Sequence, residues 1–522
     1  MPHSDFNFRY KQLLSLGGFF FMLLLIGVLA AHPYVRPALI YDEGFALTNG
    51  LRVLRGDLPF LDFWTVYPPG TSHVLAIFFS LLEPSLEVSR WVHLVWIGLM
   101  AAFAHLLMTS VANRLIASVT TMLVTAWACL ALTPSYSMTP AIALALASLT
   151  LLERGWQRDS RIACSVGGLI GGSIVFFRHD LAAYLLLSAL VCYVVLLAAN
   201  SSSCVVNARP LLRRYLGWYA AMGFASLAII LARSGIEPFV DQALLFPSLI
   251  QGDQRFLPFP AFMSFWSTST DPARWLLTWL APTMLCLALA LTGMWRRLLP
   301  ERTLLVVTIT GPLSGLLLLQ AFARLDLVHA APSLIFVAIT SSAIGGAVVG
   351  KRNVAARASC GFAVAAFSLC SVIQLSNYFH PREAVSCLYN NNCMRTAPDQ
   401  NAALDFVNRN FAADEPIFVG NRRHDRIHVN DALLYFRMNR PIPTKWNEMH
   451  PGEVTTAEVQ SQIVEELEGQ KVRVAILVDI PSGLERNASA ESSQAYVLDT
   501  YLSSQFSPVW RQGRYSVLMR RS

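Results

Sequence analysis

Two adjacent carboxylates, Asp42 and Glu43, directly follow the first apolar segment of the chain. A carboxylate this close to hydrocarbon is costly to desolvate, so it either carries a role or is an ordinary solvated loop charge. Held near a membrane surface, such a group can take a proton from an attacking hydroxyl as a general base. It can equally hold a metal ion, another cation or a neighbouring arginine. The pair is therefore a candidate for acid–base chemistry.

Three more groups of residues could contribute to the same chemistry. An aromatic and proline cluster closes the loop that begins with Asp42, and it comprises Asp62, Trp64, Tyr67, Pro68 and Pro69. Two clusters of ionisable residues lie in other connections, and they comprise Arg178, His179 and Asp180 in one and Arg324, Asp326 and His329 in the other. Whether these groups can meet depends on the helices that carry them.

The composition is that of a membrane protein. Of the 522 residues, 54% are hydrophobic and only 14% are charged, whereas soluble domains carry about 25% charged residues. The formal net charge of +7 does not indicate nucleic-acid binding on such a chain. Its distribution matters instead, because Lys and Arg concentrate on the cytoplasmic side of membrane proteins.

A membrane-spanning helix needs roughly 20 apolar residues, and eleven segments come near this length. They are 14–31, 91–110, 115–132, 137–152, 162–177, 181–199, 215–232, 274–292, 303–321, 327–348 and 358–376. The fourth segment is short for a span. We interpret the first one as an uncleaved helix and not a secretory signal, because many further spans follow it. The fold class is thus an α-helical integral membrane protein with about eleven spans.

The distribution of charge predicts how these helices are oriented. If the N-terminus is cytoplasmic, the inner connections hold 15 basic and four acidic residues, and the outer connections before residue 377 hold nine basic and twelve acidic ones. This asymmetry matches the positive-inside rule. It places the Asp42 loop and both other ionisable clusters outside. Any chemistry is therefore expected on the outer face.

Two outer connections are much longer than the usual four to six residues. They are the first outer loop, 32–90, and the outer loop 233–273, which is rich in aromatic residues and prolines. In the first of them, leucines recur at helical spacing, at Leu47, Leu51, Leu54 and Leu58. This stripe predicts a short helix along the membrane surface. The second loop could cover a lipid-facing groove, and interfacial anchoring by its aromatic residues is the alternative.

The chain changes character after residue 376, which divides it into a transmembrane domain (1–376) and a soluble domain (377–522). The second part holds 16 basic and 17 acidic residues, and helical and strand patterns alternate along it, which predicts a small α/β domain. With a cytoplasmic N-terminus and eleven spans, this domain lies on the outer side of the membrane. An oxidising compartment would allow a disulfide between Cys387 and Cys393, and two free thiols are the alternative. No Cys spacing typical of zinc sites occurs.

Together these features resemble the GT-C superfamily of membrane glycosyltransferases, which includes protein O-mannosyltransferases and bacterial aminoarabinose and RgtA-like sugar transferases. The resemblance rests on Asp42-Glu43, on the Asp62 to Gly70 segment, on the Arg178 cluster and on the layout of many helices before an extracytoplasmic domain. It implies a polyprenyl-phosphate sugar donor and inversion at the anomeric carbon. It also implies Asp42 as the general base, with Glu43 as a supporting or alternative carboxylate.

A lipid-phosphate leaving group suggests a role for the basic clusters, which could bind the phosphate. Charge develops on the phosphate oxygens as the glycosidic bond breaks, and Arg makes bidentate, permanently charged contacts with phosphate. Arg178 and Arg324 are the candidates, with His179 and His329 as secondary donors. In the alternative, each Arg pairs with the Asp two residues further along the chain and only ties a helix end.

The sequence therefore predicts transfer of a sugar from a polyprenyl-phosphate carrier to an acceptor on the outer face of a membrane. Short loops and a cysteine pair on the outer side suit a bacterial inner membrane, with the N-terminus cytoplasmic and the C-terminal domain periplasmic. The acceptor stays open: lipid A or the lipopolysaccharide core, a polysaccharide, a protein or another lipid. No metal site is predicted, although a divalent cation is conceivable. Alternatives are a transporter or flippase, or a polysaccharide polymerase or ligase, for lipid-linked sugars.

Overall fold

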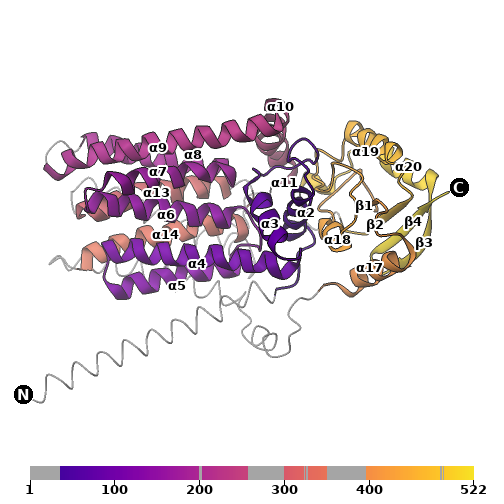
Figure 1. Cartoon of the computed structure of the whole chain (residues 1–522), viewed down its shortest axis with the longest axis horizontal. Coiled ribbons are helices and arrows are strands. Elements are labelled where there is room, and N and C mark those ends of the chain that lie inside the picture. Colours follow the sequence, from indigo (N-terminus) through magenta and orange to yellow (C-terminus); the bar gives the residue numbers. More distant parts are fainter. Residues whose placement is uncertain are drawn as a thin grey trace, which may run out of the picture.

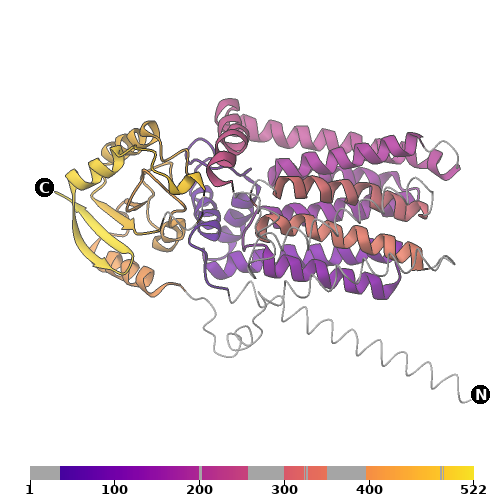
Figure 2. The same ribbon diagram turned by 180° about the vertical axis from the view of Figure 1, so that it is seen from behind.

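A computed structural model describes residues 36–198, 203–256, 299–321, 324, 327–349, 396–481, 485 and 487–521. A bundle of long helices occupies one side of the molecule, the C-terminal domain occupies the other, and two short helices of the first loop lie between them (Figure 1). The view from behind shows the same order (Figure 2). The site described below lies at the end of the bundle that meets the C-terminal domain, which we call the domain end.

The described bundle consists of eight helices. They are α4 (Leu86–Val111), α5 (Arg114–Ala131), α6 (Met138–Gln157), α7 (Arg161–Ser173, continued by the 3-10 turn η1, Ile174–Phe176), α8 (His179–Ala198), α9 (Ser203–Ser234), α13 (Glu301–Ala321) and α14 (Leu327–Val349). Polar residues set where several of them begin. The side chains of Ser85, Asn113 and Ser160 accept hydrogen bonds from the first turns of α4, α5 and α7, which satisfies donors that a helix start leaves unpaired.

Six of the described helices are long and apolar enough to cross a membrane: α4, α5, α8, α9, α13 and α14. Of the eleven expected spans, eight lie in the described part of the chain, and each of these eight is helical. The expected spans 14–31, 274–292 and 358–376 lie outside the described residues, as does the Cys387–Cys393 pair. The number eleven stays a prediction.

Small residues let α7 pack closely against its neighbours. A Cβ added at Gly168 would lie 2.3 Å from the carbonyl oxygen of Tyr215 on α9, so only glycine fits there. Close approach at small residues is a usual way for apolar helices to associate where hydrophobic burial gives little drive. α13 and α14 pack against each other, and then against α8 and α5 respectively.

The first loop contains two helices, not one. The expected surface helix is α2 (Asp42–Leu54), which begins at the acidic pair, and α3 (Gly70–Leu81) was not anticipated. In the long outer loop, α10 (Ile236–Phe239), the π-helical segment η2 (Val240–Gln251) and α11 (Gly252–Arg255) continue the path of α9. The described part of this loop is therefore helical, and its role as cover of a lipid-facing groove or as interfacial anchor stays a prediction.

The C-terminal domain is the predicted α/β unit. Its helices are α17 (Pro398–Asn410), α18 (Ala432–Met438), α19 (Ala457–Gly469) and α20 (Val497–Gln505), with a short 3-10 turn, η5 (Ala488–Ala490). Its sheet has the order β1-β2-β4-β3, with strands β1 (Ile417–Asn421), β2 (Val474–Val478), β3 (Phe506–Gln512) and β4 (Tyr515–Arg520). β1 and β2 are parallel and the other pairs antiparallel. The sequence patterns predict the four helices and the strands β1, β2 and β4, but neither β3 nor η5.

The domain is fastened to α2. Thr48 donates to the carbonyl oxygen of Ala432 at 2.8 Å, and Arg52 donates to the carbonyl oxygen of Thr444 at 2.8 Å. Gly44 allows the closest approach, because a Cβ there would lie 2.4 Å from the backbone nitrogen of Leu433. The helix that begins at the acidic pair is thus also the docking surface for the domain.

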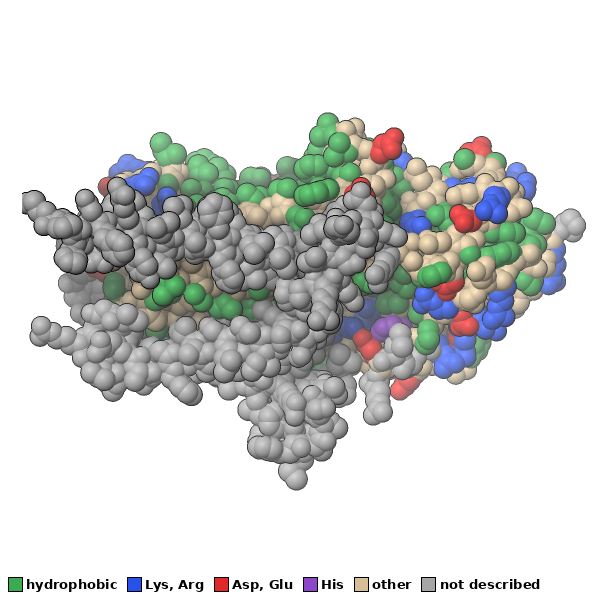
Figure 3. Space-filling view, turned by 90° about the horizontal axis from the view of Figure 1, so that it is seen from below, with side chains coloured by type: hydrophobic (Ala, Val, Ile, Leu, Met, Phe, Trp, Pro, Cys, Tyr) green, Lys and Arg blue, Asp and Glu red, His purple; other side chains and the backbone are tan. Residues whose placement is uncertain are grey.

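The distribution of side chains on the surface matches these two parts (Figure 3). Hydrophobic side chains dominate the described surface along the bundle, while Lys, Arg, Asp and Glu are mixed over the C-terminal domain. Trp91, Ile162 and Phe224 are examples of large apolar side chains exposed on α4, α7 and α9. Such a belt of apolar surface fits a lipid environment around the bundle and water around the domain.

Candidate active site

A polar cavity of about 280 Å³ lies at the domain end of the bundle. It is lined by Tyr41, Asp42, Phe45, Val66, Tyr67, Pro68, Thr133, Tyr136, Arg178, His179, Asp180, Ala243, Pro247, Gln251, Gly252, Arg255, Gln320, Arg324, Val328, His329 and His450. These residues come from α2, from both long loops and from the C-terminal domain. The others lie where α5 is followed by α6, where α7 is followed by α8 and where α13 is followed by α14. Chain segments far apart in sequence therefore share one chamber.

Seven of the residues singled out from the sequence line this cavity together. They are Asp42, Tyr67, Pro68, Arg178, His179, Arg324 and His329, and Asp180 of the Arg178 cluster is an eighth. Glu43, Asp62, Trp64 and Pro69 do not line it. The three ionisable clusters do meet, which the sequence could only suggest through the orientation of the helices.

Asp42 is the first residue of α2, and its side chain is exposed at the cavity. A carboxylate in the first turn of a helix lies near the positive end of the helix dipole. Tyr41 and Phe45, one residue before and one turn after it, line the same wall of the cavity. Asp42 is therefore held on a rigid element and still reachable from the chamber.

Glu43 points the other way and is fully buried. Its two carboxylate oxygens accept hydrogen bonds from Arg90 of α4 at 2.8 and 2.9 Å, and Oε2 also accepts from the backbone nitrogen of Leu39 at 3.2 Å. Arg90 in turn donates to the carbonyl oxygen of Arg36 at 2.7 Å. Of the two roles expected for Glu43, this geometry is compatible with support of the Asp42 turn and not with direct contact with a substrate.

Asp62, Trp64 and Pro69, the other residues of the aromatic and proline cluster, help to fix the conformation of the first loop. Asp62 accepts a hydrogen bond from the backbone nitrogen of Leu58 at 2.7 Å, which closes a turn. Trp64 is buried and contacts the rings of Phe246 and His450, with centroids 4.9 and 5.1 Å away. Pro69 precedes α3 and faces a different pocket, described below. They shape the wall without lining the chamber.

Arg178 is buried to 91% yet reaches the cavity. Its guanidinium pairs with Asp180, and its Nη1 lies 3.4 Å from the hydroxyl of Tyr136. The rings of Tyr67 and Tyr136 lie 5.6 and 5.8 Å from its guanidinium carbon. The internal pairing that the sequence offered as an alternative is thus formed, and it holds Arg178 rigidly at the chamber.

Two more guanidinium groups, those of Arg255 and Arg324, line the same cavity. Arg324 pairs with Glu485 of the C-terminal domain, whereas the sequence suggested Asp326, which lies outside the described residues. Arg255 of α11 lies 5.4 Å above the ring of Tyr41, and it donates to the backbone carbonyl of His428. No carboxylate pairs with Arg255 within the described ranges. The sequence reasoning missed Arg255 among the aromatic residues of its loop.

The C-terminal domain contributes a buried polar group to the chamber. Nε2 of His450 lies 2.9 Å from the hydroxyl of Tyr41 and 2.7 Å from Oε1 of Glu448. Burial raises the pKa of the Glu448 carboxyl to about 8, and burial together with the nearby Arg255 lowers the pKa of His450 well below its ordinary value. At neutral pH both groups are therefore held without charge.

A metal ion does not fit these residues well. Two carboxylates line the cavity, and Asp180 is already bonded to Arg178 and Gln320. Within the described ranges, no group of three or more His, Cys, Asp or Glu side chains is arranged to hold a metal ion. We therefore assign no step of the chemistry to a cation.

An apolar pocket of about 380 Å³ lies directly behind one wall of the chamber. It is lined by Leu58, Pro59, Phe60, Pro69, Gly70, His73, Val74, Phe176, Phe177, Ile229, Ile230, Arg233 and Ser234. The wall is thin, since Pro68 and Arg178 line the polar chamber while their neighbours Pro69 and Phe177 line the apolar pocket. A polar and an apolar compartment therefore adjoin each other at the domain end.

This arrangement, in which a bundle of long apolar helices carries a C-terminal domain over a site formed with the first long loop, has counterparts among solved structures. The chain resembles ArnT from Cupriavidus metallidurans in the apo state with a TM-score of 0.58 at 12% identity, covering 97% of this chain and 98% of the other. ArnT bound to undecaprenyl phosphate gives 0.57 at 13% identity, over 96% and 98% of the two chains. No protein-family model matches the sequence, and no curated protein matches it either.

Several lining residues could not be selected from the sequence. Tyr136 and Thr133 belong to a short connection without charge, and Gln320 lies inside a span. His450 is more than 400 positions from Asp42, and no pattern links the two. Only the folded chain brings them into one chamber.

Proposed function

We propose that this protein is an integral-membrane glycosyltransferase that moves a sugar from a polyprenyl-phosphate carrier to a hydroxyl acceptor. The observation that carries the proposal is the single cavity that joins an accessible carboxylate, Asp42, to three guanidinium groups, next to an apolar pocket. A lipid-phosphate sugar has these same three parts: an electrophilic carbon, an anionic leaving group and a hydrocarbon tail.

In the proposed reaction the acceptor oxygen attacks the anomeric carbon while Asp42 takes the proton from the acceptor hydroxyl. The bond between the anomeric carbon and the phosphate oxygen breaks, and its electron pair leaves with the lipid phosphate. Attack opposite to the leaving group inverts the anomeric centre. Glu43 keeps Asp42 in place through its bond to Arg90 and does not exchange protons with the substrate.

The negative charge that develops on the phosphate would be stabilised by the guanidinium groups. Preorganised cations in a chamber screened from water act strongly on such charge. Arg255 is the first candidate because no carboxylate in the described ranges pairs with it. Arg178 and Arg324 are already paired, so they would share their remaining donors. His179 and His329 line the same chamber and would serve as further hydrogen-bond partners.

The tail of the carrier would enter the apolar pocket beside α3 and α9. This places the phosphate at the thin wall, where Pro69 and Phe177 face the tail and Pro68 and Arg178 face the head group. The C-terminal domain, through His450, closes the chamber from above and would help to select the acceptor. We assign the chamber to the periplasmic face of a bacterial inner membrane, with the N-terminus cytoplasmic.

The test is a transfer assay in proteoliposomes supplied with polyprenyl-phosphate sugars, with the wild-type chain and with Asp42→Asn. Asparagine keeps the size of the side chain but cannot accept the proton, and loss of a general base lowers the rate typically by about 10² to 10⁴. Asp253→Asn is the matched control, since Asp253 is exposed on α11 and does not line the cavity.

Loss of transfer in Asp42→Asn alone, at equal amounts of inserted protein, would support the proposal. Equal transfer by both variants would exclude Asp42 as the base. If the wild-type chain transfers no sugar from any donor but moves the intact carrier across the bilayer, the protein is a flippase and the proposal fails.

A further inference from the structure

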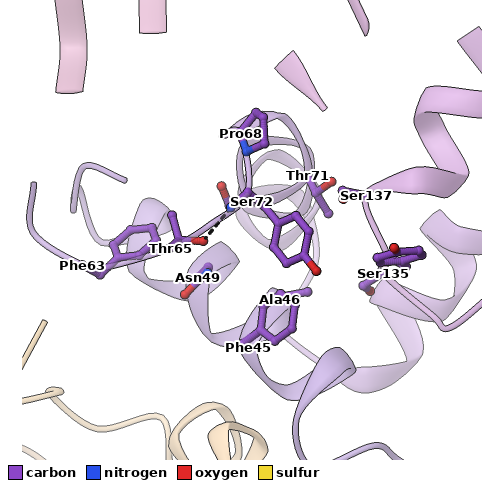
Figure 4. A pocket seen from close by; sticks show the side chains of 12 residues that line it. Phe45, Ala46, Asn49, Phe63, Thr65, Pro68, Thr71, Ser72, Ser135 and Ser137 are labelled. Carbon is purple, nitrogen blue, oxygen red and sulfur yellow. Dashed lines mark hydrogen bonds between the residues drawn. The ribbon is translucent and has the colours of Figure 1, made fainter. Parts of the chain in front are cut away.

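A small recess adjoins the cavity beside Tyr67 and Tyr136. Its volume is about 30 Å³, and it is lined by Phe45, Ala46, Asn49, Phe63, Thr65, Tyr67, Pro68, Thr71, Ser72, Ser135, Tyr136 and Ser137. It adjoins the chamber, because four of these residues line both. Figure 4 shows hydroxyl side chains arriving from α3 and from the connection between α5 and α6. We call it the hydroxyl recess.

Three hydroxyls of the recess are buried without a hydrogen-bond partner in the described part of the chain: those of Thr71, Ser135 and Ser137. This is unusual, since the great majority of buried polar side-chain atoms in proteins are paired. By contrast, Ser72 in the same recess donates to the carbonyl oxygen of Pro69 at 2.9 Å. The recess thus has donors and acceptors that the protein itself does not use.

The backbone of Ser135 in this recess also adopts an unfavourable conformation. Ser135 has a φ of +62°, a left-handed conformation that non-glycine residues seldom adopt. Two further hydroxyls nearby, those of Thr133 in the same connection and of Thr139 in the first turn of α6, are buried without a partner as well in the described part of the chain. Strained backbone and unmade hydrogen bonds are features that folded chains retain mainly at functional sites.

The recess carries no full charge. None of the side chains that line it is Asp, Glu, Lys, Arg or His. Burial raises the pKa of the Glu448 carboxyl in the C-terminal domain to about 8, so this buried group adds no negative charge near neutral pH. A group that enters the recess therefore meets neutral hydroxyls and amides.

We propose that the hydroxyl recess binds two hydroxyls on one edge of the donor sugar, and that this sugar is neutral at that edge. The inference rests on the proposed function and adds the class of sugar. The recess has space for about two water molecules, so the ring itself lies in the larger cavity beside Asp42. Two hydroxyls, or one hydroxymethyl group, replace those waters.

The absence of charged side chains in the recess would make it selective for neutral sugars over amino sugars. A sugar hydroxyl both donates and accepts, as the Ser and Thr side chains do, so each can satisfy the other. An ammonium group buried here would find no opposite charge, and burying an unpaired charge is heavily penalised. The recess is therefore expected to admit hydroxyl-bearing sugars and to reject amino sugars that present their charge on this edge.

The experiment uses the full chain in proteoliposomes and three synthetic donors: polyprenyl-phosphate glucose, polyprenyl-phosphate mannose and a polyprenyl-phosphate 4-amino-4-deoxypentose. Monodeoxy analogues of the preferred donor follow. The variants are Ser137→Ala and Ser135→Gly. Glycine removes the hydroxyl but accepts a positive φ, so Ser135→Gly should not lose stability.

We expect transfer from a neutral donor and little from the amino sugar. Each variant should raise the KM for the neutral donor roughly threefold to tenfold, the usual value of one hydrogen bond, with a smaller effect on kcat. For the matching deoxy donor, wild type and variant should have equal KM values, because the bond is already missing. Ser341→Ala is the control, since that buried hydroxyl donates only within its own helix.

The proposal is overturned if the amino-sugar donor is preferred, or if Ser137→Ala and Ser135→Gly leave every donor KM unchanged. It is also overturned if the variants lose the same factor with all deoxy donors, because a merely structural role would act in that way. These results leave transfer itself intact, so they are distinct from failure of the proposed function, in which the wild-type chain transfers none of the three sugars.

Discussion

The pair formed by Glu43 and Arg90 separates the structural from the chemical carboxylate of the Asp42-Glu43 motif. Both side chains are completely buried, and they share two hydrogen bonds of 2.8 and 2.9 Å. Replacing Glu43 by Ala would remove the carboxylate that accepts from Nε and Nη2 of Arg90 and leave the guanidinium buried. Breaking one side of such a buried pair costs about 3–5 kcal/mol.

The measurement is the free energy of unfolding by denaturant in detergent micelles, together with the transfer rate per folded molecule. Glu43→Ala should lower the free energy of unfolding by about 3–5 kcal/mol. The matched control is Asp479→Ala, which removes the 3.0 Å ion pair between Arg422 and Asp479, whose side chains are 60% and 50% exposed. That change should cost at most about 1 kcal/mol, because solvent screens the pair.

A double replacement tests the cause. Changing Glu43 to Leu and Arg90 to Met removes both charges and keeps much of the volume, so most of the lost stability should return. The reasoning is refuted if Glu43→Ala is as stable as the wild type but inactive. In that event Glu43 would act on the substrate, and Asp42 would lose its place as the base.

Three other predictions concern the domain, pH and the leaving group. Gly44→Val should loosen the C-terminal domain, because its Cβ would lie 2.4 Å from the backbone nitrogen of Leu433; amide hydrogen exchange in α18 should become faster, and unchanged protection would contradict this. The Glu448 carboxyl has its pKa raised from 4.5 to about 8 by burial, so the folded chain holds a proton that the unfolded chain has released. The free energy of unfolding should therefore fall as pH rises from about 4.5 to about 8, and Glu448→Gln should lessen this slope in denaturant titrations. Arg255→Gln should lower the rate of transfer with the protein still inserted, because it removes the guanidinium without a carboxylate partner; an unchanged rate in the proteoliposome assay would remove Arg255 from the site.

Much of the fold followed from the sequence because its signals are local. Apolar segments of sufficient length mark helices wherever they occur, and alternating patterns marked the helices and most strands of the C-terminal domain. α3 was missed because the segment from Gly70 is short and was taken as the end of a loop. β3 was missed because its outer face is exposed and Pro508 interrupts its pattern.

The candidate site divides in the same way. Residue type and the distribution of charge selected Asp42, Arg178 and Arg324, since ionisable groups at the ends of apolar segments are costly and hence conspicuous. The same signals could not separate Asp42 from Glu43, because adjacent residues differ only in the direction that the start of a helix gives them. Burial against Arg90 decides that.

The sequence by itself determined that the chain is of the membrane class, where eight described long helices run and which loops carry charge. Each of these depends on the free energy of transferring nearby residues between water and hydrocarbon, which short stretches of sequence fix. The tertiary structure alone decided that Arg255 and His450 share a chamber with Asp42, and that the Ser135 hydroxyl lies in a recess adjoining it. Contacts between distant segments depend on how whole helices and the C-terminal domain pack, and no local pattern encodes them.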